Sequence, residues 1–291
     1  MEQIIANGLY LGAQYALIAL GLTLIFALMN VLNFAHGQMY VLGGFVTYTI
    51  YGQLGLPFWL GLLASALTLA IIGALFEIFL FRPVIQRSKR EESTMLLAAA
   101  TAFLLDAIIL LLFGEKQRGV PKILDGVFNW DFRIIMPNDR IVVGILAITF
   151  IIAFILFMQY TKPGRAMRAL AQDRTAAELM GVRVQRYSMY GFALGAMLAG
   201  LVGGLLVVIT GVSSGIGGAV SIKAFMMVMI GGAGVVYGAI AGGFILGMME
   251  AVGLSVLRDY GYGDLTYLII FATLMLFLAI RPQGLMGKPW G

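Results

Sequence analysis

Long apolar stretches separated by short polar segments run along almost the whole chain. A helix that crosses a bilayer needs about 20 mostly apolar residues. The stretches that approach or reach this length cover residues 4–29, 38–52, 58–81, 95–113, 141–159, 187–210, 222–239, 241–257 and 265–281. The pattern predicts an all-α polytopic membrane protein forming one domain over residues 1–291. It predicts eight or nine transmembrane helices, depending on how fully the second and seventh stretches cross.

Two interruptions break this apolar pattern. The first is Asn30-Val-Leu-Asn-Phe-Ala-His-Gly37 and the second is the glycine-rich Gly232-Ala-Gly-Val-Val-Tyr-Gly238. The second is spaced like a dinucleotide-binding loop, but that fingerprint requires a preceding strand and a βαβ unit. We therefore expect broken or re-entrant helices near 30–37 and 231–238. Paired interruptions in two halves of a chain indicate the central pathway of a transporter.

Basic residues outnumber acids in two loops, 82–93 and 161–186, and in the tail from Arg281, which contains Lys288. Lysine and arginine mark cytoplasmic loops, so the sequence places these segments inside and the N-terminus outside. The 114–140 loop has five basic residues against four acids, and the alternation of the spans places it outside. No lysine or arginine precedes Arg82. The first apolar stretch therefore lacks the basic n-region of a signal peptide, and we expect it to be a retained span.

Composition supports a protein whose main solvent is the lipid bilayer. Hydrophobic residues make up 61% of the chain and charged residues 11%, against about 25% charged in soluble domains. The net charge of +5 comes from short loops beside the spans, so it reports topology and gives no reason to expect a nucleic-acid partner. The absence of cysteine and the single His36 leave no set of residues for a thiolate or histidine metal site.

Uncharged polar residues cluster between the first two spans. Asn30, Asn33, His36 and Gln38 could line the translocation pathway of a polar solute, together with Phe34. An equal alternative is that the asparagines cap a helix and that His36 bonds to a neighbouring span.

Three carboxylates fall within predicted spans, at Glu77, Asp106 and Glu250. A carboxylate inside the membrane is costly and suggests a functional site, such as a proton relay. Lys223, near a span end, is the one cation available to them. No spacing of paired carboxylates or of Ser, His and Asp suggests catalysis, so we expect a transport protein and not an enzyme. An ion-coupled secondary transporter remains an alternative.

Small residues recur every four positions in two later spans. Gly191, Gly195, Ala199 and Gly203 form one such series, and Ala239, Gly243, Gly247 and Ala251 form another. Small residues let helices approach closely in lipid, either as static packing or as an interface that slides. The predicted helix-packing positions are Gly191, Gly195, Gly203, Gly234, Gly238 and Gly242.

The cytoplasmic loop at about 161–186 contains a short predicted helix over 175–180. Asp173 is placed to cap its start and Gly181 to end it. Such a helix is either a docking element for a soluble partner or a solvated turn at the membrane surface.

Three stretches carry a family resemblance. They are Leu32-Asn-Phe-Ala-His-Gly37, Gly164-Arg-Ala-Met-Arg-Ala169 followed by Asp173 and Gly181, and Gly231-Gly-Ala-Gly-Val-Val-Tyr-Gly238 followed by Gly242. In this order they resemble the permease subunit of bacterial branched-chain amino acid ABC importers, the LivH type. The resemblance implies that leucine, isoleucine and valine are the substrates. Permeases for urea or short-chain amides are similar in these stretches and remain an alternative.

The resemblance also implies a location in the bacterial inner membrane and a set of partners. These are a second homologous permease, two cytoplasmic ATPases and a periplasmic or extracellular solute-binding protein. The chain lacks a Walker A motif, so no cofactor is expected in it and ATP is expected on the ATPases. The coupling residues that the resemblance implies are Arg165, Arg168, Asp173, Ala176, Ala177 and Gly181. Thr175 departs from the general coupling motif, which has Glu there.

Overall fold

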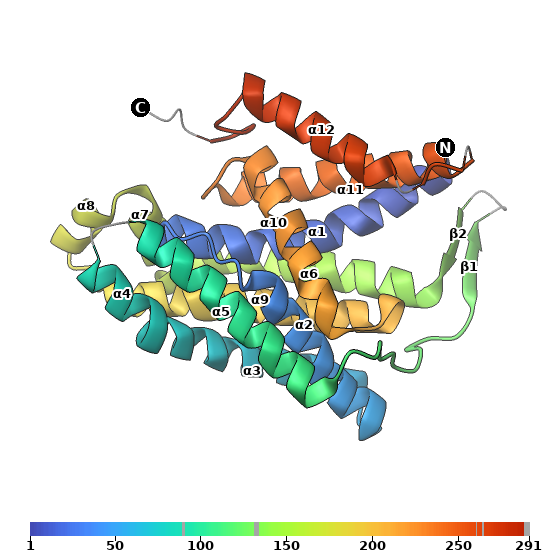
Figure 1. The fold of residues 1–291 in the computed structure, drawn as a ribbon, viewed down its shortest axis with the longest axis horizontal. Coiled ribbons are helices and arrows are strands. Elements are labelled where there is room, and N and C mark those ends of the chain that lie inside the picture. The colour runs from blue at the N-terminus through green and yellow to red at the C-terminus, as the bar shows by residue number, and fades with distance from the viewer. Residues whose placement is uncertain (89–90, 131–133, 260, 264, 288–291) are drawn as a thin grey trace.

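The computed structural model describes residues 1–88, 91–130, 134–259, 261–263 and 265–287 and shows a helical bundle with one small hairpin (Figure 1). The helices are α1 (Glu2–Met29), α2 (His36–Thr47), α3 (Phe58–Phe76), α4 (Arg82–Arg87), α5 (Glu91–Phe113), α6 (Asn138–Tyr160), α7 (Lys162–Gln172), α8 (Arg174–Leu179), α9 (Val184–Thr210), α10 (Gly217–Gly231), α11 (Val236–Asp259) and α12 (Leu265–Ile280). Strands β1 (Val127–Trp130) and β2 (Ile134–Pro137) pair antiparallel. Of the predicted basic loop residues, Lys89, Arg90 and Lys288 lie outside the described residues.

Seven helical segments of the described chain are long and apolar enough to cross a membrane. They are Glu2–Met29, Phe58–Arg87, Glu92–Phe113, Asn138–Tyr160, Val184–Thr210, Ser214–Gly231 and Val236–Arg258. The two other predicted spans correspond to α2, which continues through a π-helical segment to Gln53, and to the shorter α12. The prediction of an all-helical polytopic membrane fold is confirmed, with the hairpin as a small unpredicted addition.

Both predicted interruptions are present. The first begins at Asn30, whose left-handed backbone (φ 53°) ends α1, and α2 starts at His36. The second is shorter than predicted, because Gly232 and Gly234 adopt φ of 104° and 81° and α11 already begins at Val236. Only glycine adopts such angles freely.

The predicted span 222–239 is misplaced by this second interruption. The helical segment that occupies the region is Ser214–Gly231, so it begins and ends eight residues earlier than predicted. Its first turns contain serine and several glycines, which lowered the apparent hydropathy there. The apolar residues after Gly234 belong to the next helix.

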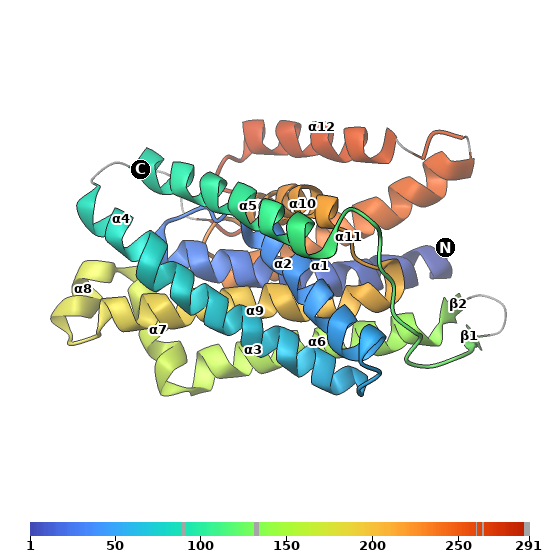
Figure 2. The same cartoon turned by 60° about the horizontal axis from the view of Figure 1, so that its bottom comes forward.

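The helix α1 is the best enclosed of the seven long spans. It contacts α11, α9, α6 and α10, and its contact with α11 is the most extensive between any two helices. Figure 2 shows α12 along one edge of the bundle, beside α11. The peripheral helices turn large apolar side chains outward, among them Leu111 of α5 and Leu276 of α12, as expected of surfaces in contact with lipid.

Close backbone approach explains why α1 and α11 pack so extensively. A Cβ atom added at Gly243 would lie 2.5 Å from the Cα of Ala16, and one added at Gly247 would lie 2.6 Å from the Cα of Gly12. The other predicted packing glycines behave in three ways. Four of them face the backbone of a neighbouring helix: Gly195, Gly203, Gly238 and Gly242. Gly191 faces the side chain of Leu28. Gly234 lies in the turn, and no atom would come closer than 3.6 Å to a Cβ added there.

The two ends of the bundle differ in character. The helices α7 and α8 lie at one end, and the N-terminus and the hairpin lie at the other (Figure 1). The basic loop 161–186 forms the first end, which the distribution of lysine and arginine assigns to the cytoplasm. On this prediction the second end is the outer one.

Candidate functional site

The predicted pathway residues lie in the first interruption and the start of α2, where Asn30 is exposed, Phe34 is half-buried and the other three are buried. Asn33 and His36 are fully buried, and Gln38 is nearly so. The side-chain oxygen of Asn33 accepts a hydrogen bond from the Ala35 backbone N–H at 3.1 Å. Asn33 therefore stabilises the turn before α2 locally, but the N-cap of α2 is Ala35, without a side-chain hydrogen bond, so the capping alternative is wrong for Asn33.

His36 contacts the middle of α1. Its Nε2 lies 3.1 Å from the backbone oxygen of Ile18, and because a carbonyl only accepts, Nε2 carries the proton. Its Nδ1 is buried and has no hydrogen-bond partner among the described residues. Gly21 makes room for the ring, since a Cβ there would lie 2.9 Å from Cε1 of His36.

Ser221 of α10 joins the first interruption to the helix that precedes the second. Its hydroxyl accepts a hydrogen bond from the Gly37 N–H at 2.9 Å and donates one to the Phe34 carbonyl at 2.9 Å. The ring of Phe34 also packs on Phe225 of α10, with centroids 4.9 Å apart. The two interruptions are thus mechanically connected through α10, which the sequence could not show.

Glu250 is the centre of a buried polar cluster. Lys223 donates to both of its carboxylate oxygens at 3.0 and 3.1 Å, and the hydroxyls of Tyr15 and Tyr267 donate to it at 2.5 and 2.8 Å. The four residues come from α10, α11, α1 and α12. Sequence reasoning named Lys223 as the one cation available to the three carboxylates, but it had no signal for the two tyrosines.

The other two carboxylates differ from each other. Glu77 is buried and binds Arg82 through both oxygens, at 3.1 and 2.5 Å. The prediction that no arginine was available to Glu77 is therefore wrong, because the helical path from α3 into α4 brings Arg82 back onto it. Asp106 lies partly exposed on α5.

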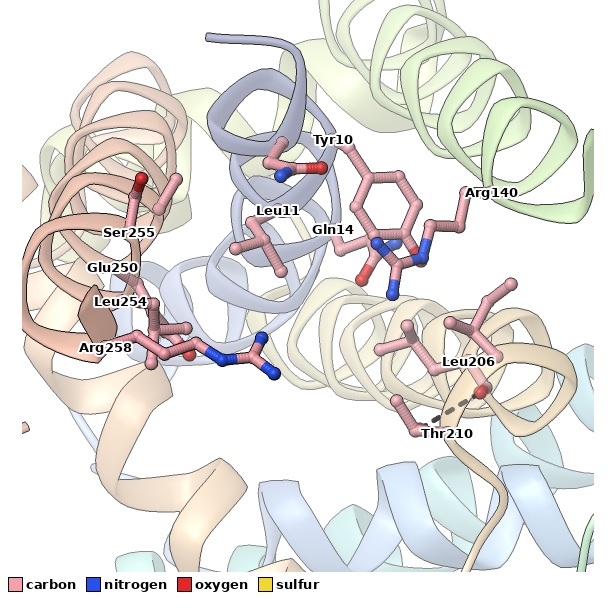
Figure 3. Close-up of a pocket in the computed structure, with 13 residues that line it drawn as sticks. Tyr10, Leu11, Gln14, Arg140, Leu206, Thr210, Glu250, Leu254, Ser255 and Arg258 are labelled. Carbon is pink, nitrogen blue, oxygen red and sulfur yellow. Dashed lines mark hydrogen bonds between the residues drawn. The ribbon is translucent and has the colours of Figure 1, made fainter. Parts of the chain in front are cut away.

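A cavity lined by both polar and apolar side chains opens at the outer end, between α1, α6, α9 and α11. Its volume is about 500 Å³. Figure 3 shows Arg140 and Arg258 reaching into this space from opposite sides, with Tyr10 and Gln14 on its α1 wall. Glu250 also lines the cavity. The sequence placed both arginines only at span ends, and their convergence depends on how the helices pack.

The cytoplasmic end presents a capped, exposed helix. The Asp173 carboxylate accepts a hydrogen bond from the Ala176 N–H at 3.0 Å at the start of α8, and Gly181 follows its end with φ 84°. Both structural predictions for this helix are confirmed. Leu179 and Met180, at its end, are 84% and 85% exposed.

The predicted coupling residues divide by exposure. Arg165, Arg168, Asp173 and Ala176 are exposed, whereas Ala177 is buried. A guanidinium N–H of Arg168 donates to the Gln159 carbonyl at 3.3 Å, which ties α7 to the end of α6. The methyl group of Ala177 faces inward, so α8 rests on the protein through one side and presents the other to the cytoplasm.

The sequence matches the family described as "Branched-chain amino acid transport system / permease component" over residues 4–278. It is 31% identical to the high-affinity branched-chain amino acid transport system permease protein LivH of Escherichia coli K12, over 97% of this chain and 94% of that protein. It is 32% identical to the permease protein BraD of Pseudomonas aeruginosa, over 99% and 96% of the two chains.

The fold also resembles a solved structure, PsaBC from Streptococcus pneumoniae in complex with Fab. The TM-score is 0.51 at 16% sequence identity, covering 96% of this chain and 92% of that one. At this identity the likeness concerns the arrangement of helices alone.

Proposed function

The chain belongs to the family of permease components of branched-chain amino acid transport systems, and from that premise we propose that α8 is the element through which ATPase partners drive it. It is a multi-pass membrane subunit of an ABC transport system and not itself an enzyme. ATP is bound by the partner ATPase, and the family implies a solute-binding protein as well. We further propose two ATPases and a second, related permease.

The exposed end of α8 is the observation that carries this proposal. Leu179 and Met180 are large, apolar and almost fully exposed at the cytoplasmic end, outside the seven long spans. Burying such a side chain contributes about 1.5–3 kcal/mol. If an ATPase surface buried both side chains, the complex between the ATPase and α8 would be stabilised.

The helix is also built to transmit a displacement. Asp173 and Gly181 define its two ends. The helix contacts α7 and α9. The helix α9 in turn packs against α1, α2 and α3. Movement of α8 by ATP-driven closure of the ATPases would therefore reach the core of the bundle and open the path to alternate sides.

The alternative of an ion-coupled secondary transporter relied on unpaired carboxylates inside the membrane. Glu77 and Glu250 are each paired with a cation, so neither stands as a free buried carboxylate that would serve as a proton carrier. We keep a narrower pathway role for five residues: Asn30, Asn33, Phe34, His36 and Gln38. We propose that they hold the first interruption against α10 and move with it during transport.

Leu179→Asp and Met180→Asp test the docking role. We expect each variant to insert normally, to bind the ATPase about 10- to 100-fold more weakly, since each apolar contact is worth about 1.5–3 kcal/mol, and to lose leucine uptake. The measurements are co-purification of the ATPase from membranes and uptake of labelled leucine. Gln172→Asp adds the same charge at an exposed position of α7 and should retain both. Full ATPase binding and uptake in the two α8 variants would contradict the proposal.

A further inference from the structure

The outer cavity has the size and placement of a ligand site. Its volume of about 500 Å³ falls within the range of about 300–1,000 Å³ that small-molecule sites occupy. It is built by four long helices at the end of the bundle opposite α8 (Figure 1). A solute arriving from outside would meet this cavity before it reached the enclosed interruptions.

The positive charges in the cavity favour the binding of an anion. Arg140 and Arg258 point into the space (Figure 3), and neither takes part in the ion pairs found among the described residues. Arg140 stacks over the Tyr10 ring at 5.7 Å. The one acidic side chain in the wall, Glu250, is already neutralised by Lys223. Among the described residues, the half-buried Arg140 and the exposed Arg258 therefore have no acidic partner, and guanidinium pairs well with carboxylate.

The α1 wall also carries two polar side chains, Tyr10 and Gln14. The Nε2 of Gln14 and the hydroxyl of Tyr10 are buried, with residue exposures of 1% and 8%. Both residues line the cavity. These two atoms are closed off from the space by their neighbours and interact with each other, so the choice of ligand rests on the two arginines.

The rest of the wall is aliphatic. Leu11, Leu206, Ile209 and Leu254 come from α1, α9 and α11. The cavity thus combines an apolar surface with two converging cations and neutral polar groups. A ligand that matches it carries one carboxylate and a compact aliphatic part.

We propose that this cavity is an outer binding site for an aliphatic α-amino acid, with the carboxylate held between Arg140 and Arg258. The proposal rests on the transport function given above and adds the residues that receive the solute. The side chain lies on the leucine-rich wall, and the neutral oxygens of Gln14 and Asn7 accept from the ammonium group. Urea and simple amides lack the carboxylate and leave both guanidinium groups unpaired, so the site discriminates against them.

Direct binding of labelled leucine to the assembled transporter, in nanodiscs of zwitterionic lipid and without the binding protein, tests the site. We expect Arg140→Gln and Arg258→Gln each to weaken binding at least about tenfold, because each removes a charge-assisted hydrogen bond. Leucine should compete fully with the label, and leucinamide, which lacks the carboxylate, should compete at least about tenfold less well. Arg118→Gln removes a positive charge from the outer loop outside the cavity wall and should bind leucine as the wild type does.

Three results would overturn the proposal. They are unchanged leucine binding in both arginine variants, equal competition by leucinamide, and displacement of leucine by anionic lipid added to the nanodiscs, which would make the cavity a site for lipid headgroups. Uptake of leucine by the wild type with its ATPases and binding protein is measured alongside. If the wild type takes up no leucine, the transport function itself is refuted. If its uptake is normal but the arginine variants bind leucine as the wild type does, only this site is refuted.

Discussion

At the scale of single residues, the buried charge of Glu250 is balanced by contacts from three other helices. Lys223 supplies the counter-charge, and Tyr15 and Tyr267 supply two further hydrogen bonds. The Lys223 ammonium also lies 5.1 and 4.7 Å from the centroids of these two tyrosine rings. A carboxylate in the membrane that is paired and hydrogen-bonded in this way can be structural, and the cluster ties α1, α10, α11 and α12 together.

Lys223→Met should destabilise the protein, because it leaves the Glu250 carboxylate buried without a cation. Breaking a buried pair in this way costs about 3–5 kcal/mol, and we expect about 3 kcal/mol because the Lys223 side chain is 25% exposed. Thermal unfolding in detergent should show a melting temperature lower by roughly 6–12 °C.

The double variant Lys223→Met/Glu250→Gln provides the internal control for this prediction. Removing both charges should restore much of the lost stability, since no unpaired charge remains. Lys116→Met, at an exposed position of the outer loop, should leave the melting temperature unchanged. Equal destabilisation in the single and double variants would show that the ion pair itself contributes little.

At the scale of elements, α8 is stabilised by hydrogen bonds at its two ends. Asp173 satisfies one of the free N–H groups at its start. After its end, the Gly181 N–H bonds to the Glu178 carbonyl and the Val182 N–H bonds to the Ala177 carbonyl, with Gly181 left-handed. These local bonds hold a six-residue helix that would be too short to persist alone.

Gly181→Ala and Gly181→Asn separate backbone conformation from side-chain size. A Cβ at this position meets no atom within 4 Å, so any effect arises from the positive φ. Alanine in the left-handed region costs about 1 kcal/mol and asparagine less. We expect Gly181→Ala to lower leucine uptake per ATP hydrolysed and Gly181→Asn to retain most of the coupling. The measurement is the ratio of uptake to ATPase rate in proteoliposomes. If the larger asparagine were as defective as alanine, bulk and not backbone conformation would be responsible.

At the scale of the whole molecule, the two ends of the bundle have separate tasks. The cytoplasmic end carries the exposed helix α8, and the outer end carries the hairpin and the arginine-lined cavity (Figure 1, Figure 3). Between them, α1 and α9 run through the bundle and contact each other. A force applied at one end therefore has a continuous helical route to the other.

The orientation can be tested directly because the natural chain contains no cysteine. Glu178→Cys lies on exposed α8 and Lys116→Cys lies on the exposed outer loop. A membrane-impermeant maleimide should label Lys116→Cys in intact cells and Glu178→Cys only after the membrane is permeabilised. The cysteine-free parent is the control for background labelling. The reverse pattern would invert the assignment of the two ends.

The sequence alone determined what depends on local chemistry. The spans other than 222–239 follow from the length of the apolar stretches, the interruptions from Asn30 and the glycines near 232, and the form of α8 from Asp173 and Gly181. The motifs near 32–37, 164–181 and 231–242 indicated the family, which the match over residues 4–278 confirms. Each of these signals lies within a few turns of one helix or loop.

Only the tertiary structure decided which side chains meet. Tyr15 and Glu250 are 235 positions apart in the chain, and Gly37 and Ser221 are 184 apart. The physical reason is that lipid is as apolar as the interior of the bundle, so hydropathy does not distinguish a face toward protein from a face toward lipid. The convergence of Arg140 and Arg258 on one cavity depends on that distinction, and it became visible only once the helices were packed.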